Sequence, residues 1–287
     1  MSLLLHKRQN EPVEPERVQL ELSGPALASA LANVATGAEE LGGIERYAEA
    51  LDLKSSMFKD VLGDGKVRNL ELEQFMGLCV FMSTVRRRVS PYLDADGFRK
   101  LKAALYDLLQ GATDTTTTDD RVAAFCAAFP QDKGHRWVRD LAAEVLHNTD
   151  PERYPLMNRW VWDAKANTGV IREIWHGEAV DHMTIPVPDS YETFVVLREE
   201  LSQYLTSNGI FSQVMQYVDL LCAQIYAEYI CAQGGSYLRT DFSAPEDPME
   251  HTRRILGLDG VKPGSQRTRL RSMDGEAFVL DDVKLLD

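Results

Sequence analysis

The densest set of side chains that could do chemistry lies in the seven-residue segment His176-Gly-Glu-Ala-Val-Asp-His182. Imidazole and carboxylate groups together suit zinc, iron or manganese, and a glutamate among them could also act as a general base. One hypothesis is therefore a divalent transition-metal site formed by His176, Glu178, Asp181 and His182, with His147 as an additional ligand. The spacing matches no zinc-protease motif, since H-E-x-x-H is absent from the chain. A polar surface loop without a ligand would contain the same residues, and we favour that interpretation.

Asp219 is a second candidate for chemistry, and we consider it beside Glu178 as a catalytic carboxylate. It lies in the largely apolar segment 210–232, which contains no lysine or arginine. A buried carboxylate is costly unless it is paired, and such groups often mark functional sites. Two interpretations stay open: a catalytic group, or a structural group that hydrogen-bonds a neighbouring tyrosine or tryptophan.

The segment from Asp60 to Glu71 resembles the calcium-binding loop of EF-hand proteins. The residues that match loop positions one, five, six, eight and twelve are Asp60, Asp64, Gly65, Val67 and Glu71. Position three is Leu62, which cannot bind an ion, and position nine is Arg68, which repels one. We therefore expect a glycine turn that joins two helices rather than a calcium site.

The segment Tyr154-Pro-Leu-Met-Asn-Arg-Trp-Val161 is similar to a segment of helix-hairpin-helix DNA glycosylases, in which a proline–apolar–acid/amide step opens a helix. The resemblance implies lysine and aspartate roles for Lys133 and Asp219. It covers only this short stretch, and the glycine-rich hairpin that those enzymes use on DNA is missing. Aromatic side chains mostly supply buried area, so we favour a core role for Trp160 and Trp162.

A basic run of ten residues near the C-terminus contains no acidic residue. Its cations are Lys262, Arg267, Arg269 and Arg271. They could contact a phosphate-bearing ligand, a nucleic acid or an acidic protein. The formal net charge of −13 argues against nucleic acid and anionic membranes as the main partners. A short loop bounded by proline and glycine is the simpler expectation.

The composition is that of an ordinary folded chain. With 287 residues, of which 44% are hydrophobic, the chain can bury a sizeable core. Its four cysteines form no C-x-x-C pair, which indicates thiols in a reducing compartment rather than a disulfide framework. The chain shows no signal-peptide pattern and no membrane-length apolar stretch. We expect a soluble cytoplasmic protein with no membrane partner.

Hydrophobic periodicity and capping residues predict a mostly α fold, a multi-helix globular body. Helices are predicted at 24–41, 44–61, 69–89, 98–109, 120–129, 134–147, 191–206, 210–232 and 245–258. A further helix after Pro151 is predicted to carry Trp160 and Trp162. Short strands are predicted at 18–22 and, as a strand or hairpin, at 277–280. The apolar helix 210–232 should form the centre against which the tryptophan-rich stretch packs.

Low-complexity and polar segments divide this body. The segment 112–119, Ala-Thr-Asp-Thr-Thr-Thr-Thr-Asp, is small and polar and is typical of a linker. The predicted divisions are a disordered arm at 1–17, an N-terminal helical lobe at 18–111, the linker, a C-terminal helical lobe at 120–260, and a basic loop plus terminal strand at 261–287.

Two classes of function follow from these features. The leading hypothesis is an accessory or regulatory protein that acts by binding another protein, because aromatic-rich loops can form a contact surface and strong catalytic motifs are missing. The alternative is an enzyme, either metal-dependent through the His/Glu/Asp cluster or similar to the helix-hairpin-helix DNA glycosylases through Asp219.

Overall fold

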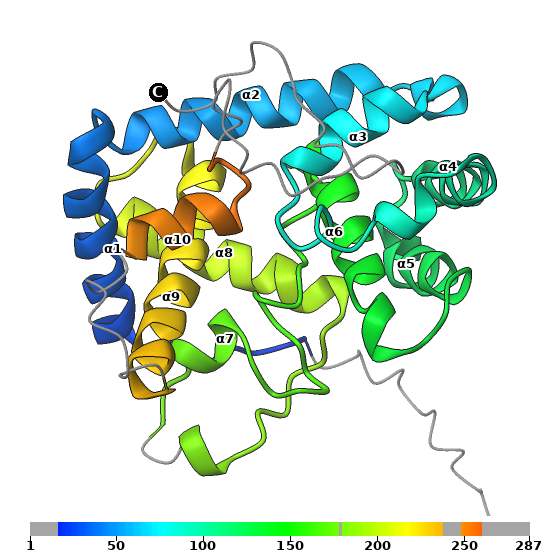
Figure 1. Cartoon of the computed structure of the whole chain (residues 1–287). Helices are drawn as coiled ribbons and strands as arrows, with labels where there is room; N and C mark the ends of the chain where they lie inside the picture. The colour runs from blue at the N-terminus through cyan, green and yellow to red at the C-terminus, as the bar shows by residue number, and fades with distance from the viewer. Residues whose placement is uncertain (1–16, 178–179, 238–247, 260–287) are drawn as a thin grey trace, which may run out of the picture.

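Helices make up most of the chain that the structure, a computed structural model, describes: residues 17–177, 180–237 and 248–259 (Figure 1). The ten α-helices within these ranges are α1 Gly24–Ala38, α2 Ile44–Leu62, α3 Leu72–Val80, α4 Ala95–Leu109, α5 Thr118–Ala127, α6 Trp137–Thr149, α7 Val170–Glu173, α8 Tyr191–Ser207, α9 Val214–Tyr237 and α10 Pro248–Ile255. The predicted mostly α class is confirmed. None of these helices is long and apolar enough to cross a membrane.

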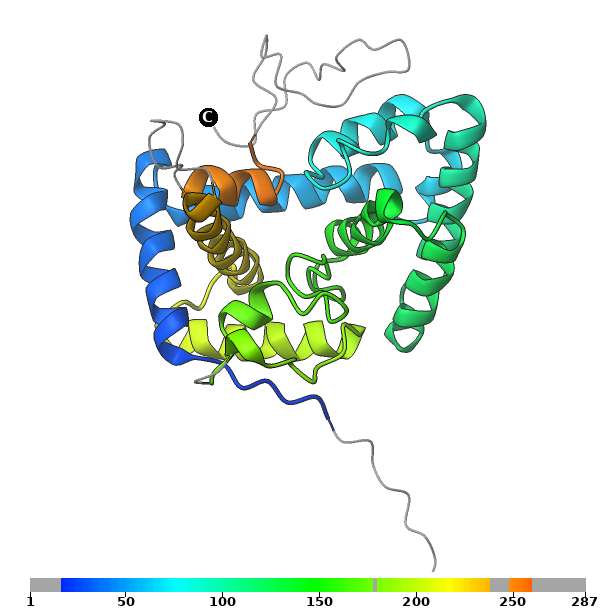
Figure 2. The same cartoon turned by 60° about the horizontal axis from the view of Figure 1, so that its bottom comes forward.

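Two helices occupy the interior of this arrangement. In the view of Figure 2, α1, α2, α8 and the α4–α5 pair surround α6 and α9. α9 packs against α1, α2, α7, α8 and α10, and α6 packs against α2, α4 and α5. Because α9 is buried on most sides, its sequence is apolar nearly all round rather than amphipathic.

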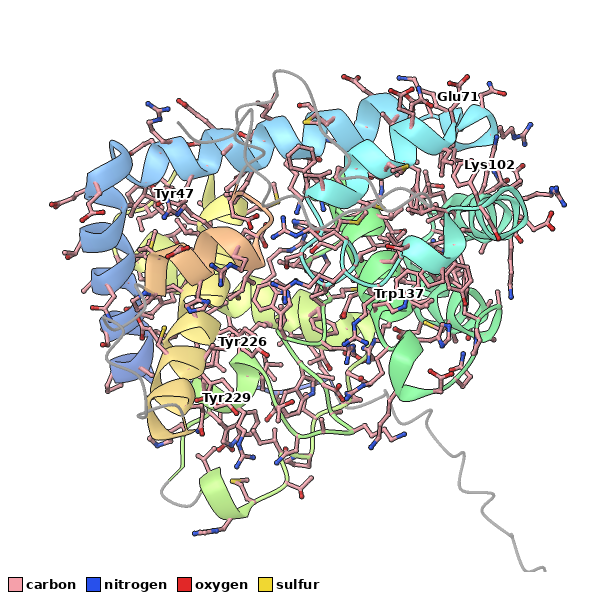
Figure 3. All side chains as sticks on the ribbon, viewed as in Figure 1. Tyr47, Glu71, Lys102, Trp137, Tyr226 and Tyr229 are labelled. Carbon is pink, nitrogen blue, oxygen red and sulfur yellow. The ribbon has the colours of Figure 1, made fainter. Side chains whose placement is uncertain are left out.

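The tryptophan-rich stretch packs on α9, as its sequence predicts. The rings of Trp160 and Tyr226 lie 5.8 Å apart, and the ring of Tyr226 lies 6.0 Å from that of Tyr229 one turn further on. Figure 3 shows these two tyrosines along α9, facing the irregular segment that carries Trp160. Trp162 is fully buried, and its indole N–H donates to the carbonyl of Val187 at 3.0 Å.

Two helix predictions are wrong. One helix is shorter than predicted, and the other predicted helix does not form. The helix predicted at 69–89 ends at Val80, and the chain turns from Phe81 onward. The Arg86 side chain accounts for this helix end. It donates to the Val80 carbonyl at 3.0 Å and forms an ion pair with Asp259 at 2.5 Å. Its guanidinium therefore satisfies a helix-end carbonyl, which leaves the chain free to turn.

The helix predicted after Pro151 is also wrong, because the chain from 151 to 169 forms turns. A proline disfavours helical backbone at the residue before it, and Pro155 follows Tyr154 directly. The backbone N–H of Arg159 donates to Asp140 at 3.1 Å instead of to a residue one turn earlier. Long-range partners therefore replace the helical ladder here.

The N-terminal strand is a third correction. The chain from 18 to 22 is extended, but it makes one isolated bridge, between Leu22 and Trp175, and the described residues contain no sheet. Hydrogen bonds flank the bridge from Ser23 N–H to Ile174 and from His176 N–H to Glu21. The partner is a turn after the short α7, so the ladder cannot propagate. The arm at 1–16, the basic run and the C-terminal strand lie outside the described residues.

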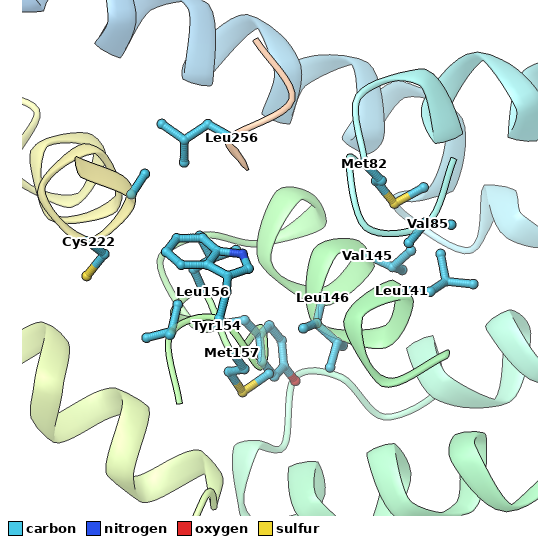
Figure 4. Close-up of a cluster of buried hydrophobic side chains, with 14 of the residues drawn as sticks. Met82, Val85, Leu141, Val145, Leu146, Tyr154, Leu156, Met157, Cys222 and Leu256 are labelled. Carbon is cyan, nitrogen blue, oxygen red and sulfur yellow. The ribbon is translucent and has the colours of Figure 1, made fainter. Parts of the chain in front are cut away.

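One hydrophobic cluster draws residues from both predicted lobes. Figure 4 shows Met82 and Val85 beside Leu141 and Val145 of α6, and Leu256 on the side of Cys222. Of the predicted linker, residues 112–117 lie between α4 and α5, and the last two residues begin α5. The two helices pack against each other. The division into two lobes remains a prediction.

Candidate functional site

The predicted metal ligands lie partly beyond the described residues. His176 follows α7, His182 ends a turn at Val180–His182, and both side chains are exposed. Glu178 and the side chain of Asp181 are outside the described part. Within the described residues, no group of three or more His, Cys, Asp or Glu side chains is placed to hold a metal ion. The metal site and the catalytic role of Glu178 therefore stay predictions.

Asp219 has a histidine as its partner, where the sequence suggested a tyrosine or tryptophan. Its Oδ2 lies 2.9 Å from Nε2 of His147 on α6, and both side chains are buried. The other ring nitrogen, Nδ1, lies 2.8 Å from the carbonyl of Tyr154. Burial lowers the pKa of His147, but the charge of Asp219 and the hydrogen bonds raise it, and the result is a pKa above 6.5. The pair joins α6 to α9.

The space beside this pair is small. A cavity of about 20 Å³ adjoins His147, Asp219, Cys222 and Arg198, which is room for about one water molecule. Lys133, the other residue that the glycosylase resemblance picks out, lines a different hollow. The geometry gives Asp219 a structural partner, and its catalytic role stays a prediction.

The EF-hand-like segment forms a turn between two helices, as we expected. Asp60 lies within α2, and the chain reverses at Asp64 and Gly65, which have φ values of 52° and 77°. Glu71 forms a capping box with Gln74 at the start of α3. A capping box holds the first turn of a helix through its free N–H groups, and that role accounts for the Glu71 side chain.

A groove made of two adjoining hollows is a feature that the sequence did not predict. The apolar hollow has a volume of about 420 Å³ and lies between α5, α6 and the start of α8. Its apolar lining includes Val122, Ala123, Ala143, Met157, Pro188 and Phe194. The cationic hollow has a volume of about 690 Å³ and lies around the start of α6. Its cations are Lys133, Arg136, Arg139, Arg159 and Lys165.

The two hollows meet at shared residues. Cys126, Arg139 and Asp189 line both of them. Arg139 forms an ion pair with Asp189 there and also donates to the Asp189 carbonyl at 2.9 Å. In the lining of the apolar hollow, Asp119 accepts a hydrogen bond of 2.8 Å from the N–H of Tyr191. The two hollows thus adjoin at the Arg139–Asp189 ion pair.

One face of α6 runs along both hollows. Arg136 lines the cationic hollow, Arg139 lines both, and Ala143 lines the apolar one. Positions i, i+3 and i+7 lie on one side of a helix, so these three residues form a single edge of the groove. The opposite side of α6 carries Leu141 and Val145 into the core. Figure 3 labels Trp137 at the start of this helix.

The carboxylates of the cationic hollow already have partners. Asp163 Oδ2 lies 2.5 Å from Nη2 of Arg136. Asp189 pairs with Arg139, as described above. Asp132 accepts hydrogen bonds from the His135 ring and from the backbone at Gly134, and these contacts hold the pKa of Asp132 below its usual value. The hollow has five cationic side chains against these three carboxylates, and the buried Asp140, which pairs with Arg159, is a fourth carboxylate beside them.

Two cations remain without such a partner. Lys133 and Lys165 are exposed, and neither forms an ion pair within the described part of the chain. They therefore give the cationic hollow a local positive excess on a chain whose formal net charge is −13.

The sequence carried only a weak signal for this groove. Lys133, Arg136 and Arg139 are spaced three apart, which places cations along one helix face, but such runs are usually solvated. Arg159 and Lys165 come from the irregular segment that was predicted to be a helix. Their meeting with the start of α6 depends on how that segment folds back.

Comparison of the chain with protein-family models gave no match. Searches of curated proteins and of solved structures gave no match either.

Proposed function

We propose that this protein is a non-catalytic accessory protein that binds an extended segment of a partner protein in the groove. The observation that carries the proposal is that the apolar hollow adjoins the cationic hollow at Arg139 and Asp189. Protein interfaces combine a desolvated apolar anchor with a polar rim in this way, and arginine is enriched in them.

The state of the ionisable groups supports binding over catalysis in this groove. A general base must be available to take a proton from a substrate. Asp163, Asp189 and Asp119 are each engaged by an arginine or a backbone N–H. These groups are arranged to fix the walls of the groove.

Affinity capture from the native cells tests the proposal with the full chain. The tagged wild type is compared with Lys133→Glu/Lys165→Glu and with a control, Lys102→Glu, on α4, which lines neither hollow. We expect a stoichiometric protein that the wild type and the control retain and the double variant loses. Equal retention by all three proteins, or no retained protein, would contradict the proposal.

A further inference from the structure

The strongest further inference concerns the chemistry of the segment that occupies the groove. We propose that it is an acidic peptide segment with one bulky apolar side chain about three residues from an acidic one. The inference rests on the proposed function and specifies its partner.

The acidic preference follows from the unpaired charge. Lys133 and Lys165 face solvent beside three arginines whose own carboxylate partners are in place. An anionic segment gains from this local field, and a cationic one is repelled.

The carboxylates already bound here indicate which anion the hollow suits. Arg136 holds Asp163 at 2.5 Å, and Arg159 holds the buried Asp140 at 2.7 Å. Arg139 holds Asp189 where the two hollows meet. Arginine matches the planar carboxylate in geometry as well as in charge. A ligand carboxylate would therefore enter a surface that is already organised around carboxylates.

The apolar requirement follows from the second hollow. Val122 and Ala123 of α5, Ala143 of α6 and Phe194 of α8 form its walls, and Met157 contributes a flexible thioether. A volume of about 420 Å³ accommodates a leucine or phenylalanine side chain. Burying such a side chain stabilises the complex in proportion to the apolar area removed from water.

The spacing follows from the edge that α6 supplies. Arg136 and Ala143 are seven residues apart, and a helix rises 1.5 Å per residue, so the two hollows are offset by about 10 Å along the helix. An extended peptide advances about 3.3 Å per residue. An acidic side chain beside Arg136 and an apolar one beside Ala143 therefore lie about three residues apart.

Selection from a random dodecapeptide display library on the full-length protein tests this inference. We expect the selected peptides to be enriched in aspartate or glutamate about three residues from leucine, phenylalanine or tryptophan. Selected peptides without acidic enrichment, or an absence of peptides that compete for the groove, would overturn it.

The charged side of the groove is tested with a fluorescent selected peptide and anisotropy. Lys133→Glu/Lys165→Glu should weaken binding about tenfold or more, and higher salt should weaken wild-type binding. Lys102→Glu should leave the affinity unchanged. A peptide affinity that changes neither on the double substitution nor with salt concentration would count against the acidic preference.

The apolar side is tested with two neighbouring exposed alanines of α5. Ala123 lines the apolar hollow and Ala124 does not. Ala123→Phe should fill the hollow and lower the affinity for the peptide about tenfold, while Ala124→Phe should leave the affinity unchanged. Equal effects of the two substitutions would place the peptide elsewhere.

The two proposals can fail separately. A cellular partner lost by the lysine double variant, together with selected peptides that lack acidic residues, would retain the function and reject the peptide chemistry. Acidic peptides that bind the groove, with no partner captured from cells, would retain the chemistry and reject the accessory role.

Discussion

Asp219 of α9 and His147 of α6 form a buried ion pair, with 2.9 Å between Oδ2 and Nε2. The opposite ring nitrogen lies 2.8 Å from the carbonyl oxygen of Tyr154. Both of these partners are acceptors, so both ring nitrogens must donate, and only the imidazolium form has two N–H groups. His147 is therefore a structural cation that holds α6, α9 and the segment after α6 together.

This pair predicts a pH-dependent stability. The pKa of His147 in the folded state lies above 6.5, because Asp219 and the hydrogen bonds outweigh the opposing effect of burial, and Glu144 adds to the increase. A raised pKa stabilises the fold fully below pH 6.5, and the contribution is lost as pH rises through the folded-state value. We expect His147→Gln to cost about 3 kcal/mol at pH 5.5 and clearly less at pH 9.

Urea unfolding of the wild type and His147→Gln at several pH values measures this difference. The exposed His182 provides a matched control, and His182→Gln should change the stability by less than about 0.5 kcal/mol. A cost of His147→Gln that grows toward alkaline pH would show that the ring is neutral in the folded protein.

A second buried pair predicts strong coupling between α2 and α6. Lys54 Nζ lies 3.0 Å from Glu144 Oε2 and 2.9 Å from the carbonyl of Leu256. Asn148 and Asn158 donate to the same carboxylate at 3.0 and 3.2 Å. Removing one charge leaves the other buried and uncompensated, so Lys54→Met and Glu144→Gln should each cost about 3–5 kcal/mol.

The double variant Lys54→Met/Glu144→Gln should cost less than the two single costs together, by about 1 kcal/mol or more. A double-mutant cycle from urea unfolding measures this coupling. The exposed Lys59 on the same helix is the control, and Lys59→Met should change stability by less than about 0.5 kcal/mol. Additive costs would mean that the pair contributes little beyond its separate contacts.

Local signals explain why most helices could be predicted. Ser23 accepts a hydrogen bond from the N–H of Ala26 at the start of α1, as a serine before the helix should. The glycines Gly42 and Gly43 end the next turn with positive φ. These signals act within a few residues, so the sequence contains them directly.

The parts that could not be predicted depend on distant partners. The end of α3 is set by Arg86 and Asp259, and the partner of Asp219 is a histidine on another helix. The groove brings together α5, α6, the start of α8 and an irregular segment with Lys165. Local periodicity in the sequence cannot show which distant segments pack together, so the groove could be found only in the tertiary structure.

Two glycines with the same backbone conformation predict different costs. Gly257 follows α10 with φ of 73°, and a Cβ there would lie 1.9 Å from the carbonyl oxygen of Phe81. Gly65 has φ of 77°, and a Cβ there would meet nothing within 4 Å. Gly65→Ala should therefore lower the free energy of unfolding only by the strain of a left-handed backbone, about 1 kcal/mol. Gly257→Ala adds a backbone clash and should cost about 3 kcal/mol or more.

Thermal and urea unfolding of both variants measure this contrast. Because the φ strain is common to the two, the difference reports how tightly the turn after α10 packs on the end of α3. Equal costs would mean that the backbone at Phe81 gives way to the added methyl group.

The cysteines predict a chemical test of the groove. Burial raises the pKa of Cys79 and Cys222 well above that of a free thiol, and both are buried, so they should resist iodoacetamide in the folded protein. Cys126 is half-buried where the two hollows meet, and burial raises its pKa as well. It should react slowly near neutral pH and faster as pH rises.

A groove-bound peptide should protect Cys126 because the peptide covers both hollows that this thiol lines. Cys231, which is half-buried on α9 outside both hollows, provides the internal control. Mass spectrometry of the labelled peptides should show Cys126 labelling slowed by a saturating acidic–apolar peptide and Cys231 labelling unchanged. Equal slowing at both thiols would indicate a general tightening of the fold instead of occupancy of the groove. Unchanged labelling of Cys126 under saturating peptide would place the bound peptide away from the junction at Arg139.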